Sequence, residues 1–254
     1  MNTSNNAVLI TGGATGIGYA LAESFIKAGS EVLICGRRKN RLMEVQKKYP
    51  KIKIFQCDIS KEDDRKKLLE YVKENFSNLN ILINNAGIQR DVNLINGLDD
   101  LLRGEDELKI NLEAPIHMCI LFVPFLLNKK SQTYIINVSS GLGFTPAVRM
   151  PIYSTTKAGL HVFTKCLRQQ LINAKSSMKV IEIIPPAVES ELNIEGRKKR
   201  GASFGTKADE FVAAVMKQLI EGKEEIGYGF TDQVMNASKK ELDERFQSMN
   251  ARMQ

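Results

Sequence analysis

The sequence predicts an α/β fold, with one doubly wound, mostly parallel sheet covered by helices on both faces. Short apolar runs rich in β-branched residues alternate along the chain with helix-length segments, as repeated βα units do. Most of these runs are nearly continuous in apolar character, which is typical of strands buried on both faces. No linker-like stretch divides the 254 residues. We therefore expect a single domain over 1–254.

The apolar runs predict six strands and set the positions of the helices between them. The strands are expected at 7–11, 31–35, 53–57, 81–84, 134–138 and 180–184. In "SKEDDRKKLLEYVKENF", Ser60 is the predicted N-cap and Asp63 the third helical residue, close to a capping box. In "TKADEFVAAVMKQLIEG", Thr206 and Asp209 repeat this pattern, and Gly222 predicts the end of the helix. Two further helices are expected at about 105–128 and 154–173.

Two polar segments, 88–104 and 185–205, do not fit the alternation. Both follow predicted strand ends, and ligands bind at the carboxyl ends of such sheets. We expect both segments to form walls of a site, and 185–205 to act as a substrate lid.

The composition excludes several classes of function. A net charge of +7 is modest for this length and does not by itself indicate a nucleic-acid partner. The basic run at 197–200 has no interleaved aromatic residues and is interpreted as a solvated loop. The N-terminus "MNTSNNAVLI" lacks signal-peptide features, and the apolar run "MCILFVPFLL" is too short to span a bilayer. We expect no membrane insertion and no nucleic-acid binding.

The cysteines and histidines predict neither a metal site nor a disulfide framework. The four cysteines are widely spaced without a CxxC pair, and the chain has only two histidines. These features favour a reducing, cytoplasmic location. The two histidines, His117 and His161, lie on apolar helix faces and are interpreted as core or interface residues. Three of the four cysteines are interpreted as core residues; the four are Cys35, Cys57, Cys119 and Cys166.

A glycine-rich loop joins the first strand to the first helix in "VLITGGATGIGYALAESF". Gly12, Gly16 and Gly18 give the spacing TGxxxGxG from Thr11. Glycine permits a tight turn and close approach of the backbone to a pyrophosphate, while the helix presents its free N–H groups. The second strand ends about 20 residues further on, where a ribose would bind. The loop predicts a dinucleotide site, and the alternative is a glycine-rich turn with no ligand.

A tyrosine and a lysine lie four residues apart in "PIYSTTKAGL". On a helix, Tyr153 and Lys157 would share one face. An ammonium near a phenol favours the phenolate and lowers the phenol pKa, which would allow proton transfer near neutral pH. The alternative is ordinary packing against the sheet.

Taken in order, "TGGATGIG", "NNAG" at 84–87, Asn111, Ser140 and "YSTTK" resemble the short-chain dehydrogenase/reductase family in its standard form. The resemblance extends from about residue 8 to about residue 220 and implies a single Rossmann domain. The stretch "PPAV" resembles the DltE-like group of this family. Pro186 stands where the family usually has glycine, and proline fixes φ and removes a donor.

The resemblance implies an oxidoreductase that transfers a hydride between NADP(H) and a small-molecule carbonyl or alcohol substrate. Tyr153 would be the acid/base, Lys157 would assist it and hold the nicotinamide ribose, Ser140 would stabilise charge on the reacting oxygen, and Asn111 would anchor a water. Ser139 is the rival of Ser140, and the family's sequence spacing of thirteen residues before Tyr153 favours Ser140. Besides Tyr153 and Lys157, the expected cofactor-binding residues are Gly12, Thr15, Gly16, Ile17, Gly18, Arg37, Arg38, Asp58, Ile59, Asn84, Asn85, Ala86, Gly87, Pro185, Val188 and Ser190.

The end of the second strand, "EVLICGRRKNRL", favours NADP, with NAD as the alternative. Sites for NAD usually place an acidic residue here, whereas this chain has Gly36 followed by Arg37 and Arg38. Guanidinium groups match phosphate oxygens. In the other interpretation, these arginines are solvated residues before the next helix, or Arg37 stacks on the adenine.

Two further expectations concern the whole protein. The helices expected at about 105–128 and 154–173 resemble the pair that forms a four-helix interface in this family, which implies a homodimer or homotetramer. The alternative to an enzyme is a non-catalytic nucleotide-binding regulator with the same fold.

Overall fold

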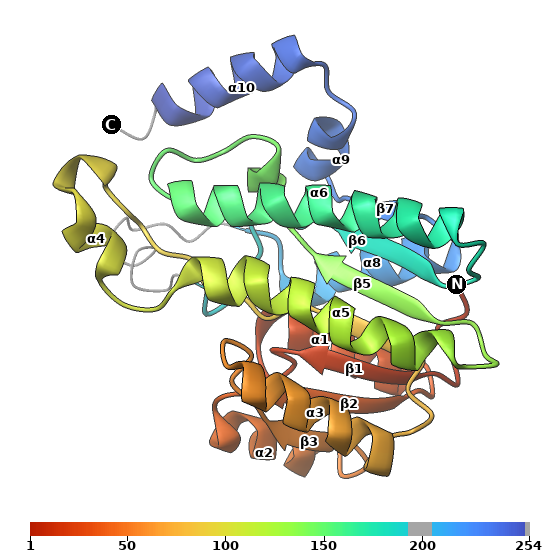
Figure 1. Ribbon diagram of the computed structural model, residues 1–254. Coiled ribbons are helices and arrows are strands. Elements are labelled where there is room, and N and C mark those ends of the chain that lie inside the picture. The colour runs from red at the N-terminus through yellow and green to blue at the C-terminus, as the bar shows by residue number, and fades with distance from the viewer. Residues whose placement is uncertain (193–204, 252–254) are drawn as a thin grey trace.

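Seven parallel strands form one sheet in the computed structural model, which describes residues 1–192 and 205–251. The strand order is β3-β2-β1-β4-β5-β6-β7 (Figure 1). The order therefore reverses direction between β1 and β4. The bounds are β1 Ala7–Thr11, β2 Glu31–Gly36, β3 Lys53–Gln56, β4 Ile81–Asn84, β5 Tyr134–Val138, β6 Lys179–Ile183 and β7 Glu225–Ile226.

The predicted fold class is confirmed. The bounds of each of the six predicted strands differ by at most one residue from those of an observed strand. The seventh strand was not predicted, since the two residues of β7 are too few to show a periodic pattern. Most of the expected lid, 185–205, and all of the basic run at 197–200 lie outside the described residues.

Helices cover both faces of the sheet because successive strand residues point to opposite sides. On one face, residues of α1, α2 and α8 pack with Val8 and Ile10. On the other face, residues of α3, α5 and α6 pack with Leu9 and Leu82, and Figure 1 shows these helices across the near side. The bounds are α1 Gly16–Lys27, α2 Lys39–Lys48, α3 Glu62–Asn75, α5 Ala114–Leu127, α6 Pro151–Asn173 and α8 Ala208–Ile220.

Both predicted N-caps are wrong by a residue or more. Helix α3 begins at Glu62 with Lys61 at the N-cap position, because the Ser60 hydroxyl is bonded to Asp58 at 2.7 Å. Helix α8 begins at Ala208, because the Thr206 backbone is bonded to the segment after β6. Its end is as predicted, with Gly222 at a φ of +83° just after the helix.

The apolar run in α5 belongs to a helix that lies within the expected range of about 105–128. A π-turn, η2 Lys109–Glu113, leads directly into α5. The combined helix Lys109–Leu127 is long and apolar enough to cross a membrane, judged on length and composition alone, and 44% of its most apolar window is buried. Its side chains Met118, Phe122 and Leu126 are part of the core, and core helices give the same signal.

Short elements surround the carboxyl ends of the strands. They are η1 Leu94–Asn96, α4 Leu98–Leu102 and η3 Gly141–Gly143, together with α9 Phe230–Met235 and α10 Lys239–Ala251 near the C-terminus. Asn250 joins α10 to the loop before α6, since it accepts a bond from Val148 N at 2.9 Å and donates to Pro146 O at 3.1 Å. These elements frame the ends of the strands, where a ligand would enter.

Candidate active site

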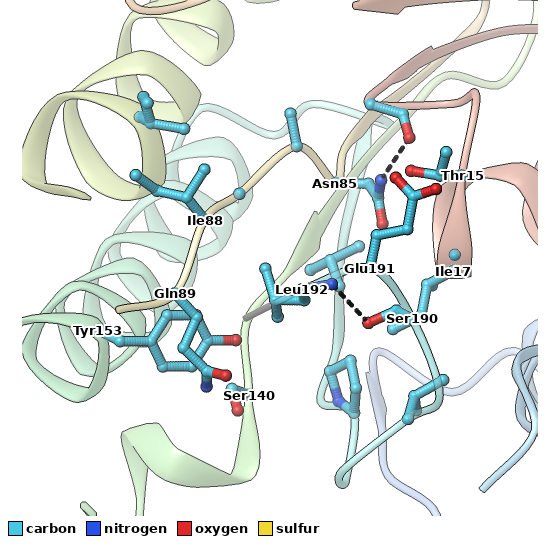
Figure 2. Close-up of a pocket in the computed structure, with 18 of the residues that line it drawn as sticks. Thr15, Ile17, Asn85, Ile88, Gln89, Ser140, Tyr153, Ser190, Glu191 and Leu192 are labelled. Atoms are coloured by element: carbon cyan, nitrogen blue, oxygen red, sulfur yellow. Dashed lines mark hydrogen bonds between the residues drawn. The ribbon is translucent and has the colours of Figure 1, made fainter. Parts of the chain in front are cut away.

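A cavity of about 680 Å³ opens at the carboxyl ends of the strands, where the strand order reverses. The predicted site residues line it, with three exceptions: Gly18, Asn84 and Asn111. Figure 2 shows Thr15 and Ile17 at one end of this cavity and Tyr153 and Ser140 at the other. The glycine loop and the tyrosine–lysine face, 140 residues apart in sequence, therefore belong to one cavity.

The glycine loop has the form that a dinucleotide needs. Gly12 and Gly16 have φ values of +65° and +54°, which favour glycine. A Cβ on Gly12 would lie 2.9 Å from Ala86 Cα, and one on Gly18 would lie 2.4 Å from Gly12 O. Gly18 thus serves close packing inside the loop and does not face the cavity. Helix α1 begins at Gly16 beside the cavity, so its free N–H groups and positive dipole end fit a pyrophosphate.

Asn85 ties the glycine loop to the end of β4. Its side-chain amide donates to Thr11 O at 2.9 Å, and its backbone N–H donates to Thr11 Oγ1 at 3.0 Å. Asn84 instead points into the core, where it donates to Asn137 Oδ1 at 2.9 Å. It does not line the cavity as predicted, because alternate strand residues face opposite sides of the sheet.

The arginines after β2 lie at the rim of the cavity, and each is paired with a carboxylate. Arg37 pairs with Glu105. Arg38 lies 2.7 Å from Glu191, which also pairs with Arg41 at 3.1 Å. The paired side chains are each 40% or more exposed, so the ion pairs contribute little stability and an incoming anion can displace them. Nothing lies within 4 Å of a Cβ built on Gly36.

Ser140, Tyr153 and Lys157 meet at the other end of the cavity. Ser140 is the N-cap of η3, and its hydroxyl accepts a bond from Leu142 N at 3.2 Å. It therefore caps this turn and lines the cavity as well. Ser139 also lines the cavity, and its hydroxyl is buried without a hydrogen-bond partner among the described residues.

Lys157 is buried beneath Tyr153 on the same face of α6. Its Nζ lies 5.6 Å from the centre of the Tyr153 ring and donates to Val138 O at 2.8 Å. Burial lowers the pKa of Lys157 to about 8, and the charge of Glu182 acts in the opposite direction. The lysine is thus a buried amine with one N–H bonded to the end of β5.

Asn111 lies in the π-turn η2 and is 1% exposed. Its side chain holds the backbone of Ile88 at both groups, accepting from N and donating to O at 2.8 Å each. Asn111, which was expected to anchor a water, does not line the cavity itself. Gly87 lies beside it: a Cβ on Gly87 would be 3.2 Å from Asn111 Oδ1 and 3.7 Å from Lys157 Nζ. π-turns often mark functional sites, and this one fixes the wall beside Lys157.

Several residues that line the cavity were not predicted individually from the sequence. Gln89 and Arg90 belong to the 88–104 segment that was expected to form a wall. Phe230 and Met249 come from α9 and α10, far along the chain, and nothing in their local sequence indicated the site. Pro185 O accepts a bond from Gly141 N at 3.0 Å, so the backbone before Pro186 is bound to η3.

Each histidine lies against a charged side chain. His117 Nδ1 lies 2.7 Å from the buried Arg65, and His161 Nδ1 lies 2.8 Å from Glu182. Over 1–192 and 205–251, no group of three or more metal-ligating side chains is present. All four cysteines are free, and Cys166 is the exposed one.

Comparison with known proteins agrees with this geometry. The family model described as short chain dehydrogenase matches residues 6–201. The chain is 40% identical over 251 residues to the uncharacterized oxidoreductase DltE of Bacillus subtilis (strain 168), covering 98% of each protein. A short-chain dehydrogenase from Sphingobium yanoikuyae, solved in complex with NADPH, is 25% identical, with a TM-score of 0.74 over 87% of each chain.

A second solved structure shares the fold at lower identity. It is a short chain dehydrogenase from Burkholderia cenocepacia J2315 in complex with NADP, 23% identical, with a TM-score of 0.78 over 97% of this chain and 99% of that one. With the family model over most of the chain and the close similarity to DltE, the chain belongs to the short chain dehydrogenase family, a family of NAD(P)-dependent dehydrogenases and reductases.

Proposed function

We propose that this protein transfers a hydride between NADP(H) and a carbonyl or alcohol substrate, with Tyr153 as the acid/base. The observation that carries the proposal is the meeting of Tyr153, Lys157 and Ser140 at one end of the cavity whose other end is the glycine loop. Proximity of this kind is what a reaction between a bound cofactor and a substrate requires.

The glycine loop and the N-terminus of α1 would hold the cofactor pyrophosphate, and Asp58 and Ala86 would line its adenosine end. Asp58 is fixed for this role, because its carboxylate accepts bonds from Ser60 N and Oγ at 3.1 and 2.7 Å. When bound, the cofactor supplies the hydride. The protein supplies position and electrostatics.

Tyr153 would donate its proton to the substrate oxygen during reduction and accept it during oxidation. The Lys157 ammonium near the ring favours the ionised phenol over the neutral one. One Lys157 N–H is used by Val138 O, which leaves two for the ribose hydroxyls. Ser140 would donate to the substrate oxygen and stabilise the charge that develops there.

Binding and turnover together separate an enzyme from the alternative, a non-catalytic nucleotide-binding regulator. NADPH binding is measured by fluorescence, and oxidation of NADPH is then followed with a panel of ketones and aldehydes. The proposal expects both binding and turnover with at least one carbonyl compound. Tight binding without turnover across the panel would favour the regulator.

We also propose a preference for NADP(H) over NAD(H). Arg37 and Arg38 follow Gly36 at the rim of the cavity, and the Glu191 carboxylate pairs with Arg38 and with Arg41. A 2′-phosphate would take the place of this carboxylate and gain bidentate, charge-assisted bonds. Glu191 competes with the phosphate for Arg38 and Arg41. The preference for NADP(H) therefore depends on the phosphate carrying a greater negative charge than the carboxylate.

The cofactor preference is tested by comparing kcat/KM for NADPH and NADH in the unmodified protein and in Gly36→Asp. A Cβ at this position has nothing within 4 Å, and the new carboxylate would repel the phosphate. Loss of one charge-assisted contact costs about 1.5–3 kcal/mol, roughly tenfold or more in kcat/KM for NADPH. Equal or better use of NADH by the unmodified protein would overturn this preference.

We propose that α5 and α6 form the contact in a homodimer or homotetramer. Ile120 on α5 and Val162 and Ile172 on α6 are more than half exposed, at 62%, 58% and 57%. Exposed apolar side chains on neighbouring helices favour burial against another copy. Light scattering should give a mass above that of one chain, and Ile120→Lys with Val162→Lys should reduce it to the monomer.

A further inference from the structure

A carboxylate lies buried on β6, the strand next to the edge strand β7. Glu182 is 0% exposed, and its register neighbours are Asn137 on β5 and Glu225 on β7. Ionisable side chains are almost never fully buried unless they are paired, because loss of hydration costs several kcal/mol. The position of Glu182 in a strand whose other buried residues are apolar therefore requires an explanation.

The Glu182 carboxylate has one hydrogen-bond partner among the described residues, His161 on α6. The distance from His161 Nδ1 to Glu182 Oε2 is 2.8 Å. An ionised carboxylate only accepts, so Nδ1 carries the proton and donates. The imidazole is held in turn by Phe144, with ring centres 4.6 Å apart. The second oxygen, Oε1, is buried and has no hydrogen-bond partner within the described part of the chain.

His161 continues the stripe of side chains that carries the proposed chemistry. Tyr153, Lys157 and His161 are spaced by four residues on α6, so they lie on one face, a turn apart. Glu182 lies beneath this face. Its negative charge acts on Lys157, in the direction that favours the ammonium and against the effect of burial.

The other ionisable groups around Glu182 are already paired. On α6, Arg168 lies 3.0 Å from Glu225 Oε1 and 3.5 Å from Glu224 Oε2, and it donates to Val180 O. On β5, the facing residue Asn137 is neutral and donates to Thr164 Oγ1 at 2.9 Å. Glu182 is thus the carboxylate whose charge is directed at Lys157.

We propose that Glu182, oriented by His161, is a positioning residue: it is the internal counter-charge that keeps the buried Lys157 ammonium protonated. This inference deepens the proposed function and rests on it. A lysine that lost its proton would no longer favour the Tyr153 phenolate and would bind the ribose less well. Glu182 acts through Lys157 and does not itself touch the substrate or the cofactor.

The test uses the whole protein without cofactor and follows the Cε resonance of labelled Lys157 by NMR as the pH is raised. The resonance is assigned by its absence in Lys157→Met. Glu182→Gln keeps the shape of the side chain and removes the charge, and we expect Lys157 to lose its proton at a pH lower by about one unit or more. Glu225→Gln, a matched control on the next strand, should leave the titration unchanged.

The same variants are then compared by the pH dependence of kcat/KM with an accepted carbonyl substrate. In Glu182→Gln, the loss of kcat/KM at alkaline pH should begin at a lower pH. This shift should equal the shift of the Lys157 titration, and lowering the pH should restore the activity. A merely structural role would lower activity equally at every pH.

If Glu182→Gln does not fold, His161→Phe provides the second variant, since it keeps an aromatic ring against Phe144 and removes the donor to the carboxylate. It should move the Lys157 titration in the same direction. An unchanged titration in the variant that folds would overturn the inference. Absence of turnover in the unmodified protein would contradict the proposed function alone, because the NMR titration does not require it.

Discussion

Replacing Lys157 with methionine should change how the stability of the protein depends on pH. The lysine is 4% exposed, and burial lowers its pKa from 10.5 to about 8, a difference of about 2.5 pH units. Each unit corresponds to about 1.36 kcal/mol. The buried ammonium therefore costs the folded state about 3 kcal/mol wherever it is charged in both states.

The sign follows from which state holds the proton. Below about pH 8 the lysine is charged in the folded and unfolded states, and the full cost is present. Between about pH 8 and 10.5 the unfolded chain binds more protons than the folded protein. The lysine's contribution to the free energy of unfolding therefore rises through this interval, and methionine has no such contribution.

The assay is urea unfolding of both proteins at pH values below and above this interval. The chain has no tryptophan, so unfolding is followed by circular dichroism. Groups that titrate in both proteins cancel in the difference. We expect the stability of Lys157→Met relative to the unmodified protein to fall by about 3 kcal/mol from the lower pH to the higher. A difference that does not depend on pH would refute the description of Lys157 as a buried, charged lysine.

Three further variants test other parts of the site. Gly18→Ala places a Cβ 2.4 Å from Gly12 O and should lower the free energy of unfolding by about 1–3 kcal/mol; Gly36→Ala, with open space around its Cβ, is the control, and equal urea midpoints for the two would contradict the packing role. Asn111→Ala leaves both backbone groups of Ile88 unpaired and should cost about 1–3 kcal/mol in the same assay, where an unchanged midpoint would count against the clamp. Ser140→Ala should reduce kcat by roughly a hundredfold or more, with NADPH affinity within a few-fold, and a normal kcat would exclude Ser140 as the group that stabilises the reacting oxygen.

The sequence was sufficient for six of the seven strands and for the two ends of the cavity, because both depend on local patterns. Continuous apolar runs predict buried parallel strands, and glycine spacing predicts the phosphate loop. The contacts that join distant segments left no local pattern. The pairing of Arg38 with Glu191, 153 residues apart, and the clamp of Asn111 on Ile88 required the structure.

The residues that were misplaced or missed have the same explanation, since their positions depend on contacts between distant segments. Asn84 was predicted to line the cavity because it begins the "NNAG" motif, but the pleat of β4 turns its side chain into the core, toward Asn137. Met249 on α10 reaches the cavity only because the chain folds back over it. Glu182 looked like one residue of an apolar strand, and its pairing with His161 appears only when α6 lies over β6.

The most direct test of the central claim is the rate of NADPH oxidation by Tyr153→Phe with a carbonyl substrate that the unmodified protein accepts. Phenylalanine keeps the ring over Lys157 and removes the transferable proton, so kcat should fall by at least about a hundredfold while NADPH affinity, measured by fluorescence, stays within a few-fold. A normal kcat in Tyr153→Phe would show that Tyr153 is not the acid/base and would contradict the proposed reaction at this site.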